Sequence, residues 1–137
     1  MYDAVLGNLD RADVVIKAAA PADYKVAKVS DKKIKSDELT LKLKKNPDIA
    51  AAVGKIKGDK KLVIFSAETN DCEANARAKL KKKNADMVVL NDVTKKGAGF
   101  NTDTNAVTVI TRDDEKEFGL LDKTVLADLL LDEIGKL

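Results

Sequence analysis

Apolar runs alternate along the chain with segments in which apolar residues recur at helical spacing. Short apolar runs at 12–19, 61–67 and 85–90 predict buried strands, because such runs suit strands that are covered on both faces. Helical patterns at 46–57 and 71–84 precede the second and the third of these runs. This order is typical of βαβ units, so we predict an α/β fold with a mainly parallel sheet and flanking helices.

The first of these predicted helices has recognisable ends. Asn46 and Pro47 are expected to be its N-cap and its first helical residue, because a short polar side chain followed by proline is a common helix start. The helix is expected to end before Gly58, and the second helix near Asn84.

The pattern changes in the C-terminal third of the chain. Residues 106–111 and 116–120 predict an antiparallel strand pair with a turn between them. A final helix is predicted over 123–137, where leucine and isoleucine recur at helical spacing and indicate a core-facing stripe. Residues 1–9 also show a helical pattern.

Residues 24–45 interrupt the α/β order with a concentration of lysine. Partial apolar and polar alternation in this segment predicts a hairpin flap that projects from the sheet. Its eight lysines are Lys25, Lys28, Lys32, Lys33, Lys35, Lys42, Lys44 and Lys45.

The amino-acid composition excludes several kinds of catalytic and metal-binding site. With 137 residues, 45% of them hydrophobic and 35% charged, the chain has the size and composition of one globular domain, 1–137. There is no histidine, and Cys72 is the only cysteine. These counts exclude a Ser-His-Asp triad, a Cys-His dyad, the usual zinc sites and an internal disulfide.

The charge balance and hydropathy bear on partners and location. Twenty-five basic and 23 acidic residues leave a net charge of +2, and aromatic residues make up only 4% of the chain, which argues against a nucleic-acid partner. No apolar run approaches the roughly 18 residues of a membrane span. We therefore expect a cytoplasmic protein with small-molecule partners, no nucleic acid and no membrane.

Polar and small residues follow each predicted parallel strand. The segments 18–24, 66–70 and 91–93 should meet at one edge, because the carboxyl ends of parallel strands lie together and ligands bind there. The alanines at 18–20 would let the backbone approach a flat ring or a phosphate, or they would serve close helix packing. The residues alone do not choose between these two interpretations.

Two further features suit an anionic ligand. The helix start at 46–49 presents unpaired N–H groups, although an ordinary capped helix has the same sequence pattern. Lys79 and Lys83 lie one turn apart on one helix face, where they would hold a polyphosphate or form a solvated surface. Residues 97–101 form a glycine-containing loop that would fold over a ligand, but the G-x-G-x-x-G and Walker patterns are absent.

Taken together and in order, these motifs resemble those of phosphopantothenoylcysteine synthetase, the ligase half of the bacterial bifunctional coenzyme A biosynthesis enzyme. The resemblance spans nearly the whole chain. The motifs are 19–24 (AAPADY), 33–35 (KIK), 46–49 (NPDI), 65–69 (FSAET), 76–80 (ARAKL), 91–93 (NDV) and 99–101 (GFN) with Asn105.

The resemblance implies a Rossmann-like fold and a homodimer in which the flap reaches the neighbouring subunit's site. It implies CTP-dependent ligation of 4′-phosphopantothenate to L-cysteine through an acyl-cytidylate, with Mg²⁺ as the metal. Such nucleotidyl transfer depends on positioning and charge neutralisation, which lysines and helix N-termini supply without histidine.

The resemblance also assigns site residues. Lys33 would promote conversion of the acyl-cytidylate, and Asp23 would help to hold the metal. The residues expected to contact CTP are Lys17, Ala18, Ala19, Asp23, Lys33, Pro47, Asp48, Ile49, Ala50, Phe65, Lys79 and Lys83.

The sequence departs from the family pattern in two respects. Ser36 stands where the flap motif of the family continues with another lysine. The N-terminal strand, glycine-rich turn and asparagine-bearing loop of the family are not in this sequence, so we expect the chain to be a C-terminal part of the ligase domain. A non-catalytic nucleotide-binding or dimerisation fragment is therefore the alternative function.

Overall fold

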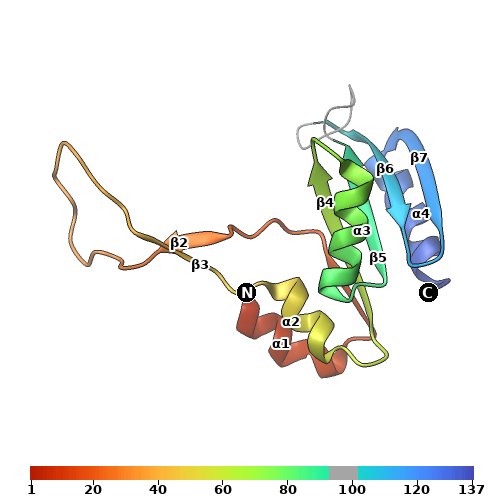
Figure 1. Cartoon of the computed structure of the whole chain (residues 1–137), viewed down its shortest axis with the longest axis horizontal. Helices are drawn as coiled ribbons and strands as arrows, with labels where there is room; N and C mark the ends of the chain where they lie inside the picture. The colour runs from red at the N-terminus through yellow and green to blue at the C-terminus, as the bar shows by residue number, and fades with distance from the viewer. Residues whose placement is uncertain (93–101) are drawn as a thin grey trace.

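The computed structural model describes residues 1–92 and 102–137. The helical elements are α1 (Tyr2–Asn8), the 3-10 turn η1 (Leu9–Arg11), α2 (Ile49–Ile56), α3 (Cys72–Lys83) and α4 (Lys123–Ile134). The strands are β1 (Val14–Lys17), β2 (Tyr24–Val26), β3 (Leu43–Lys45), β4 (Lys61–Glu68), β5 (Met87–Asp92), β6 (Thr104–Ile110) and β7 (Glu115–Asp122). Figure 1 shows their arrangement.

A five-stranded sheet in the order β1-β4-β5-β6-β7 forms the centre of the molecule. Strands β1, β4 and β5 run parallel, whereas β6 and β7 join them antiparallel. The predicted α/β fold with a C-terminal antiparallel pair and a final helix is therefore confirmed. No helix in the described ranges is long and apolar enough to cross a bilayer.

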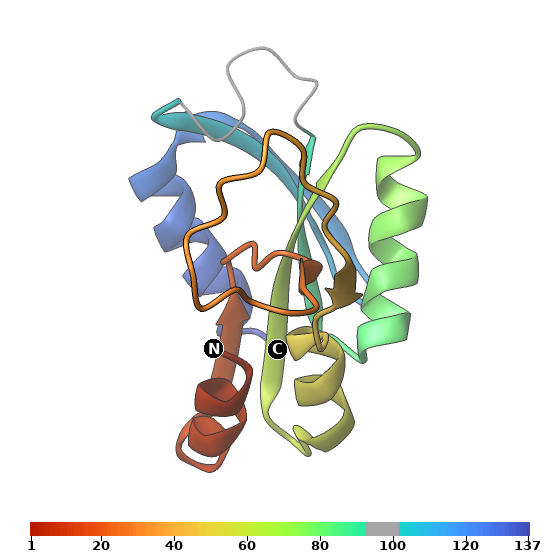
Figure 2. The same cartoon turned by 90° about the vertical axis from the view of Figure 1, so that its left-hand side faces the viewer.

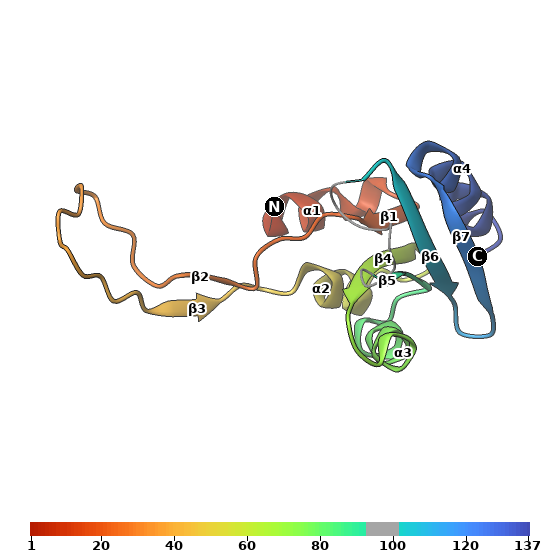
Figure 3. The ribbon, with the colours of Figure 1, turned by 90° about the horizontal axis from the view of Figure 1, so that it is seen from above.

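Helices cover both faces of this sheet, and each face has its own core (Figures 2 and 3). On one face, Val53 of α2 and Leu80 of α3 pack with Leu62 and Val88 of the sheet. On the other face, the predicted stripe of α4 is buried against strand residues such as Met87. Alternate residues of β4 and β5 point to opposite cores, which is why their sequences are continuously apolar.

The flap is confirmed, but its paired part is shorter than the alternation predicts. Only Tyr24–Val26 and Leu43–Lys45 pair, and residues 27–42 between them are exposed as they extend from the body (Figure 1). Val29 is 72% exposed. An isolated two-stranded ribbon has no third strand or helix to pack on, so its outer part gains too little to form regular strands.

A buried ion pair joins the ends of the parallel strands opposite their carboxyl edge. Lys57, 6% exposed, donates to both carboxylate oxygens of Asp86, at 3.0 and 2.8 Å. Asp86 Oδ2 also accepts the Leu62 backbone N–H at 2.8 Å. These bonds compensate for the lost hydration of both charges and tie the end of α2 to the starts of β4 and β5.

Helices α2 and α3 meet backbone to backbone at Gly54. A Cβ atom added there would lie 1.8 Å from the Lys83 carbonyl oxygen, so a larger residue does not fit without moving a helix. The Asn84 side chain secures the contact by donating to the Gly54 carbonyl at 2.9 Å. Asn84 adopts a left-handed conformation with φ of 49°, which ends α3 where the sequence predicts.

We expect Gly54→Ala to lower the free energy of unfolding by about 2–3 kcal/mol, because the new methyl group overpacks a backbone contact. Gly7→Ala is the matched control, since Gly7 is also helical and a Cβ there meets nothing within 4 Å. The control should change stability by no more than a gain of about 1 kcal/mol. Urea unfolding of the two variants measures the difference, and equal effects would contradict the assignment.

Candidate functional site

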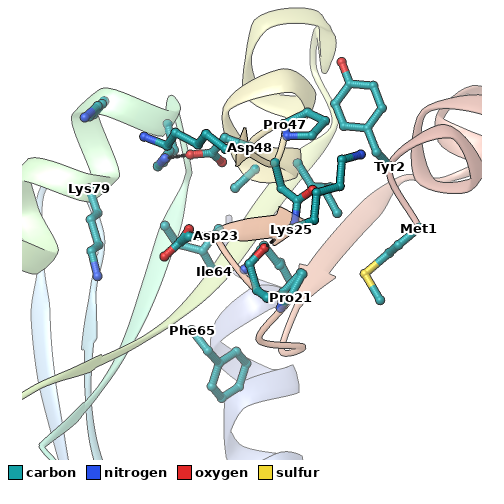
Figure 4. Close-up of a pocket in the computed structure, with 18 of the residues that line it drawn as sticks. Met1, Tyr2, Pro21, Asp23, Lys25, Pro47, Asp48, Ile64, Phe65 and Lys79 are labelled. Carbon is teal, nitrogen blue, oxygen red and sulfur yellow. Dashed lines mark hydrogen bonds and ion pairs between the residues drawn. The ribbon is translucent and has the colours of Figure 1, made fainter. Parts of the chain in front are cut away.

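A cleft of about 650 Å³ opens where the carboxyl ends of β1 and β4 meet the root of the flap. Helices α2 and α3 form one side of it and the start of α1 another (Figure 4). Of the three segments predicted to meet after the parallel strands, 18–24 supplies Pro21, Ala22 and Asp23 to the lining, whereas no residue of 66–70 or 91–92 lines the cleft.

The start of α2 faces this cleft, but its cap differs from the predicted one. Asp48, not Asn46, is the N-cap: its side chain accepts the Ala51 N–H at 3.0 Å. The helix begins at Ile49, so Pro47 precedes the cap instead of opening the helix. The backbone N–H groups of the first helical turn have no intrahelical partner and give the cleft a partial positive charge.

Asn46 has a different role that its position in the sequence does not reveal. Its side-chain amide donates to the Ala22 carbonyl at 2.8 Å, and its backbone N–H donates to the Asp23 carbonyl at 2.7 Å. These two bonds join the start of α2 to the segment after β1. They hold the two strands of the flap together at the point where they leave the body.

An ion pair between Lys83 and Asp48 connects the end of α3 with the start of α2. Burial alone would raise the pKa of Asp48, but hydrogen bonds from Lys83 and the Ala51 N–H outweigh it. With added attraction from Lys17, they hold the pKa of this carboxyl below its ordinary value of 3.8. Asp48 is therefore a stable anion beside the helix start.

Lys79 takes part in a second charged group one turn earlier on α3. Its ammonium donates to Ser66 Oγ at 2.8 Å and forms an ion pair with Glu68. Burial alone would raise the pKa of Glu68, whereas the hydrogen bonds from Lys79 and Ser66 lower it below 4.5. Lys79 and Lys83 both line the cleft, and each has a carboxylate partner.

The floor and the opposite wall combine apolar and charged groups. Ile64 and the half-buried Phe65 come from β4, and Figure 4 shows Phe65 below Ile64 in the cleft. Lys17, at the end of β1, donates to the Ala19 carbonyl at 3.2 Å. Asp23 is exposed at the mouth. An apolar surface beside several charges suits a ligand with a ring at one end and anionic groups at the other.

Most of the residues expected to contact CTP line this one cleft. Ala18 and Ala19 are exposed in the loop after β1 and do not line it, and Lys33 lies in the outer flap. Those that do line it are Lys17, Asp23, Pro47, Asp48, Ile49, Ala50, Phe65, Lys79 and Lys83. Their contacts with a nucleotide remain predictions.

The cleft also includes residues that the sequence analysis did not select. Lys25 and Lys45 come from the flap root, Lys82 from α3 and Tyr2 from α1. A signal for Lys25 and Lys45 was available, because both lie within two residues of selected motif residues. It was hidden by the other lysines of the flap.

The carboxyl end of β5 contributes a polar group with no partner. Asn91 is 9% exposed, and its side-chain oxygen has no hydrogen-bond partner in the described part of the chain. A buried acceptor without a hydrogen-bond partner destabilises the fold, and a donor group of a ligand would satisfy it. The glycine loop at 97–101 and Val93 lie outside the described residues.

The carboxylates give limited support for a bound metal. Among residues 1–92 and 102–137, no three cysteine, aspartate or glutamate side chains gather to hold an ion. Mg²⁺ commonly binds through one or two carboxylates together with substrate phosphates and water. The exposed Asp23 carboxylate is compatible with that arrangement and would need the phosphates of a ligand to complete it.

This site defines an α/β domain that has a lysine-lined cleft at the carboxyl edge of a mainly parallel sheet, where open α/β sheets bind their ligands. The chain belongs to the family described as DNA/pantothenate metabolism flavoprotein C-terminal domain, which it matches over residues 1–137. The resemblance inferred from the motifs is thus confirmed for this family.

Similar proteins include three bacterial proteins named coenzyme A biosynthesis bifunctional protein CoaBC. The chain is 42% identical over 142 residues to that of Vibrio vulnificus (strain CMCP6), covering 100% of the chain and 35% of the relative. For Escherichia coli (strain K12) the identity is 43% over 140 residues, covering 98% and 34%. For Bacillus subtilis (strain 168) it is 44% over 140 residues, covering 100% and 34%. The chain therefore spans about a third of the length of these relatives.

Two solved structures have the same fold. The crystal structure of the C-terminal domain of coenzyme A biosynthesis bifunctional protein CoaBC matches with a TM-score of 0.78 and 34% identity, over 97% of this chain and 58% of that one. The DNA/pantothenate metabolism flavoprotein from Streptococcus pneumoniae matches with a TM-score of 0.73 and 22% identity, over 98% and 69%. At 22% identity, the match to the Streptococcus pneumoniae protein supports only a shared fold.

The ion pair at the helix start should make stability depend on pH. Because the folded pKa of Asp48 is lowered, its contribution is full above 3.8 and is lost as the pH falls through the folded value. Wild type should exceed Asp48→Asn in unfolding free energy by less than about 1 kcal/mol near neutrality, since the pair is partly exposed. Urea unfolding across the acid range should show this gap closing.

The same titration separates the charge of Asp48 from its cap. Asp48→Ala also removes the acceptor of the Ala51 N–H, so it should be less stable than Asp48→Asn by about 1 kcal/mol at every pH. Asp37→Asn, in the exposed flap, is a control that should follow wild type throughout. A gap for Asp48→Asn that is independent of pH would contradict the electrostatic role.

Proposed function

We propose that this domain acts in coenzyme A biosynthesis as a phosphopantothenate–cysteine ligase. It would use CTP to join 4′-phosphopantothenate to L-cysteine through an acyl-cytidylate. The family membership and the printed names of the relatives support the pathway. The printed names do not state the reaction, so support for the ligation comes from the cleft and from the motif resemblance.

The observation that carries the proposal is the charge of the cleft. Six lysines and three aspartates of the described residues line it, together with the N-terminal end of α2. An excess of positive charge next to apolar β4 residues suits a nucleoside triphosphate, because the phosphates meet lysines and N–H groups while the base has a nonpolar surface. The residues that supply this charge are Lys17, Lys25, Lys45, Lys79, Lys82 and Lys83.

The proposed reaction has two steps. A carboxylate oxygen of 4′-phosphopantothenate attacks the α-phosphorus of CTP, and pyrophosphate leaves with the electrons of the broken P–O bond. The cysteine amine then attacks the acyl carbon, CMP leaves with the electrons of the broken C–O bond, and the amine proton passes to solvent. Neither step requires histidine, because the main demand is stabilisation of charge on the phosphates.

Different residues of this chain would have different roles in these two steps. The first-turn N–H groups of α2, at Ile49 and Ala50, would orient the nucleotide, and Lys79 and Lys83 would neutralise phosphate charge. Phe65 would contact the base or the ribose. Mg²⁺, when bound, would screen the phosphates, and Asp23 would help to hold it.

The position of the flap supports a role for a second copy of the chain. Lys33 lies in the exposed outer flap and does not line the cleft. Figures 1 and 3 show the flap extending away from the body. In the proposed homodimer, Lys33 would enter the neighbouring subunit's cleft and neutralise charge while the amine attacks.

A non-catalytic nucleotide-binding fragment is a second candidate. The chain covers 58% of the matched C-terminal domain structure, and the remainder of that domain has no counterpart here. A cleft completed by further chain would bind nucleotide weakly and would not turn it over. Binding of CTP without pyrophosphate release selects this candidate over the ligase.

Calorimetric titration of the chain with CTP and then with ATP, both with Mg²⁺, tests the proposal. We expect CTP to bind more tightly than ATP, and we expect pyrophosphate release only when 4′-phosphopantothenate is added. Equal affinity for the two nucleotides would contradict the assignment to a CTP-dependent enzyme. Pyrophosphate release without the pantothenate substrate would contradict the proposed first step.

Two substitutions separate binding from turnover. Lys79→Ala should weaken CTP binding about tenfold, the effect of losing one charged hydrogen bond. Lys33→Gln should leave pyrophosphate release intact while amide formation falls, because Lys33 serves only the second step. Product analysis by mass spectrometry distinguishes the two, and amide formation by Lys33→Gln at the parental rate would exclude the role of Lys33.

A further inference from the structure

The lysines of the cleft fall into two groups according to their partners. Lys79 and Lys83 are held in ion pairs with Glu68 and Asp48. Lys25 and Lys45 also line the cleft, yet neither side-chain ammonium has a hydrogen bond or an ion pair with any described residue. An incoming anion would have to compete with a carboxylate for the first two lysines but not for the second two.

The flap root fixes where Lys25 and Lys45 lie. In the β2–β3 pairing, Lys25 is opposite Lys44 and Tyr24 is opposite Lys45. One residue beyond Lys45, the two Asn46 hydrogen bonds join this ribbon to the segment after β1. Figure 4 shows Lys25 between Pro21 and Tyr2 at the side of the cleft. Both lysines are therefore on the best-anchored part of the flap.

Their chemistry suits phosphate better than any other part of a nucleotide. A lysine ammonium is a compact point charge with three donors, and it gains most from an anion that has oxygens on several sides. The apolar side chains that would receive a base, Ile64 and Phe65, come from β4 and not from the flap root. A terminal phosphate also carries more charge than the α-phosphate, which is esterified on two sides.

We infer that Lys25 and Lys45 bind the terminal phosphates of the nucleotide and thereby tie the flap root to the polyphosphate. This inference rests on the proposed function and adds to it a pair of binding residues for the leaving pyrophosphate. Lys79 and Lys83, each also paired with a carboxylate, then act mainly on the α-phosphate. The flap root is thus a part of the binding site in its own right.

The test compares Lys25→Gln and Lys45→Gln with Lys44→Gln, measuring affinity for CTP and CMP by calorimetry. Lys44 is the matched control, because it lies in β3 beside Lys45 and opposite Lys25 but does not line the cleft. Each cleft variant should weaken CTP binding about tenfold, as expected for a lost charged hydrogen bond. The control should change it less than about twofold, because Lys44 does not line the cleft and salt screens its exposed charge.

CMP identifies the part of the nucleotide that is bound. Because CMP lacks the terminal phosphates, Lys25→Gln and Lys45→Gln should leave its affinity unchanged. An equal loss for CMP and CTP, or an equal loss in the Lys44→Gln control, would overturn the inference while the proposed function stands. A parental chain that binds neither nucleotide would overturn the proposed function itself, and with it this inference.

The same experiment also measures binding of the other phosphate-bearing substrate, 4′-phosphopantothenate. If Lys25 and Lys45 hold the polyphosphate of CTP, their substitution leaves the affinity for 4′-phosphopantothenate unchanged. Inorganic pyrophosphate, titrated alone, should lose affinity in the two cleft variants but not in Lys44→Gln. Loss of 4′-phosphopantothenate binding with normal CTP binding would overturn the inference by assigning the lysines to the other substrate.

Discussion

The close contact between α2 and α3 at Gly54 determines the charged wall of the cleft. Because no side chain separates the two backbones there, the end of α3 lies against α2 and the Lys83 side chain extends back to Asp48. The Asn84 amide locks this arrangement from the end of α3. The helix start and the lysine that accompanies it are thus positioned by the packing of Gly54 against the Lys83 backbone.

The cleft has more lysines than carboxylates, and two of the lysines form ion pairs with carboxylates of the same chain. Asp48 and Glu68 hold Lys83 and Lys79 in place, and their lowered pKa values show that the carboxylates stay ionised over the neutral range. Lysines without partners would repel one another and sample many rotamers. Two paired and several unpaired lysines therefore give a site that remains ordered when empty and still attracts an anion.

The sequence predicts the sheet well because burial on both faces leaves a strong local signal in β4 and β5. It predicts the wrong cap for α2, since the Asn46 amide is already bonded to Ala22, 24 residues earlier, and such a bond leaves no local pattern. Lys25 and Lys45 were missed for a related reason. Eight lysines in one segment look alike in the sequence, and only the folded structure shows that Lys25 and Lys45 line the cleft while the other six do not.

The paired root of the flap constrains insertions and deletions more strictly than the exposed tip does. Residues 27–42 are exposed, so insertions, deletions or an attached fluorophore near the tip should leave the body unaltered. Tyr24 and Lys45 share one face of the ribbon, and Lys25 and Lys44 share the other. A single inserted residue in β2 or β3 would exchange these faces and move the lysines relative to the cleft. Positions of the tip away from Lys33 therefore offer a site for chemical labelling, whereas an insertion among the six residues of the root would disturb the β2–β3 register.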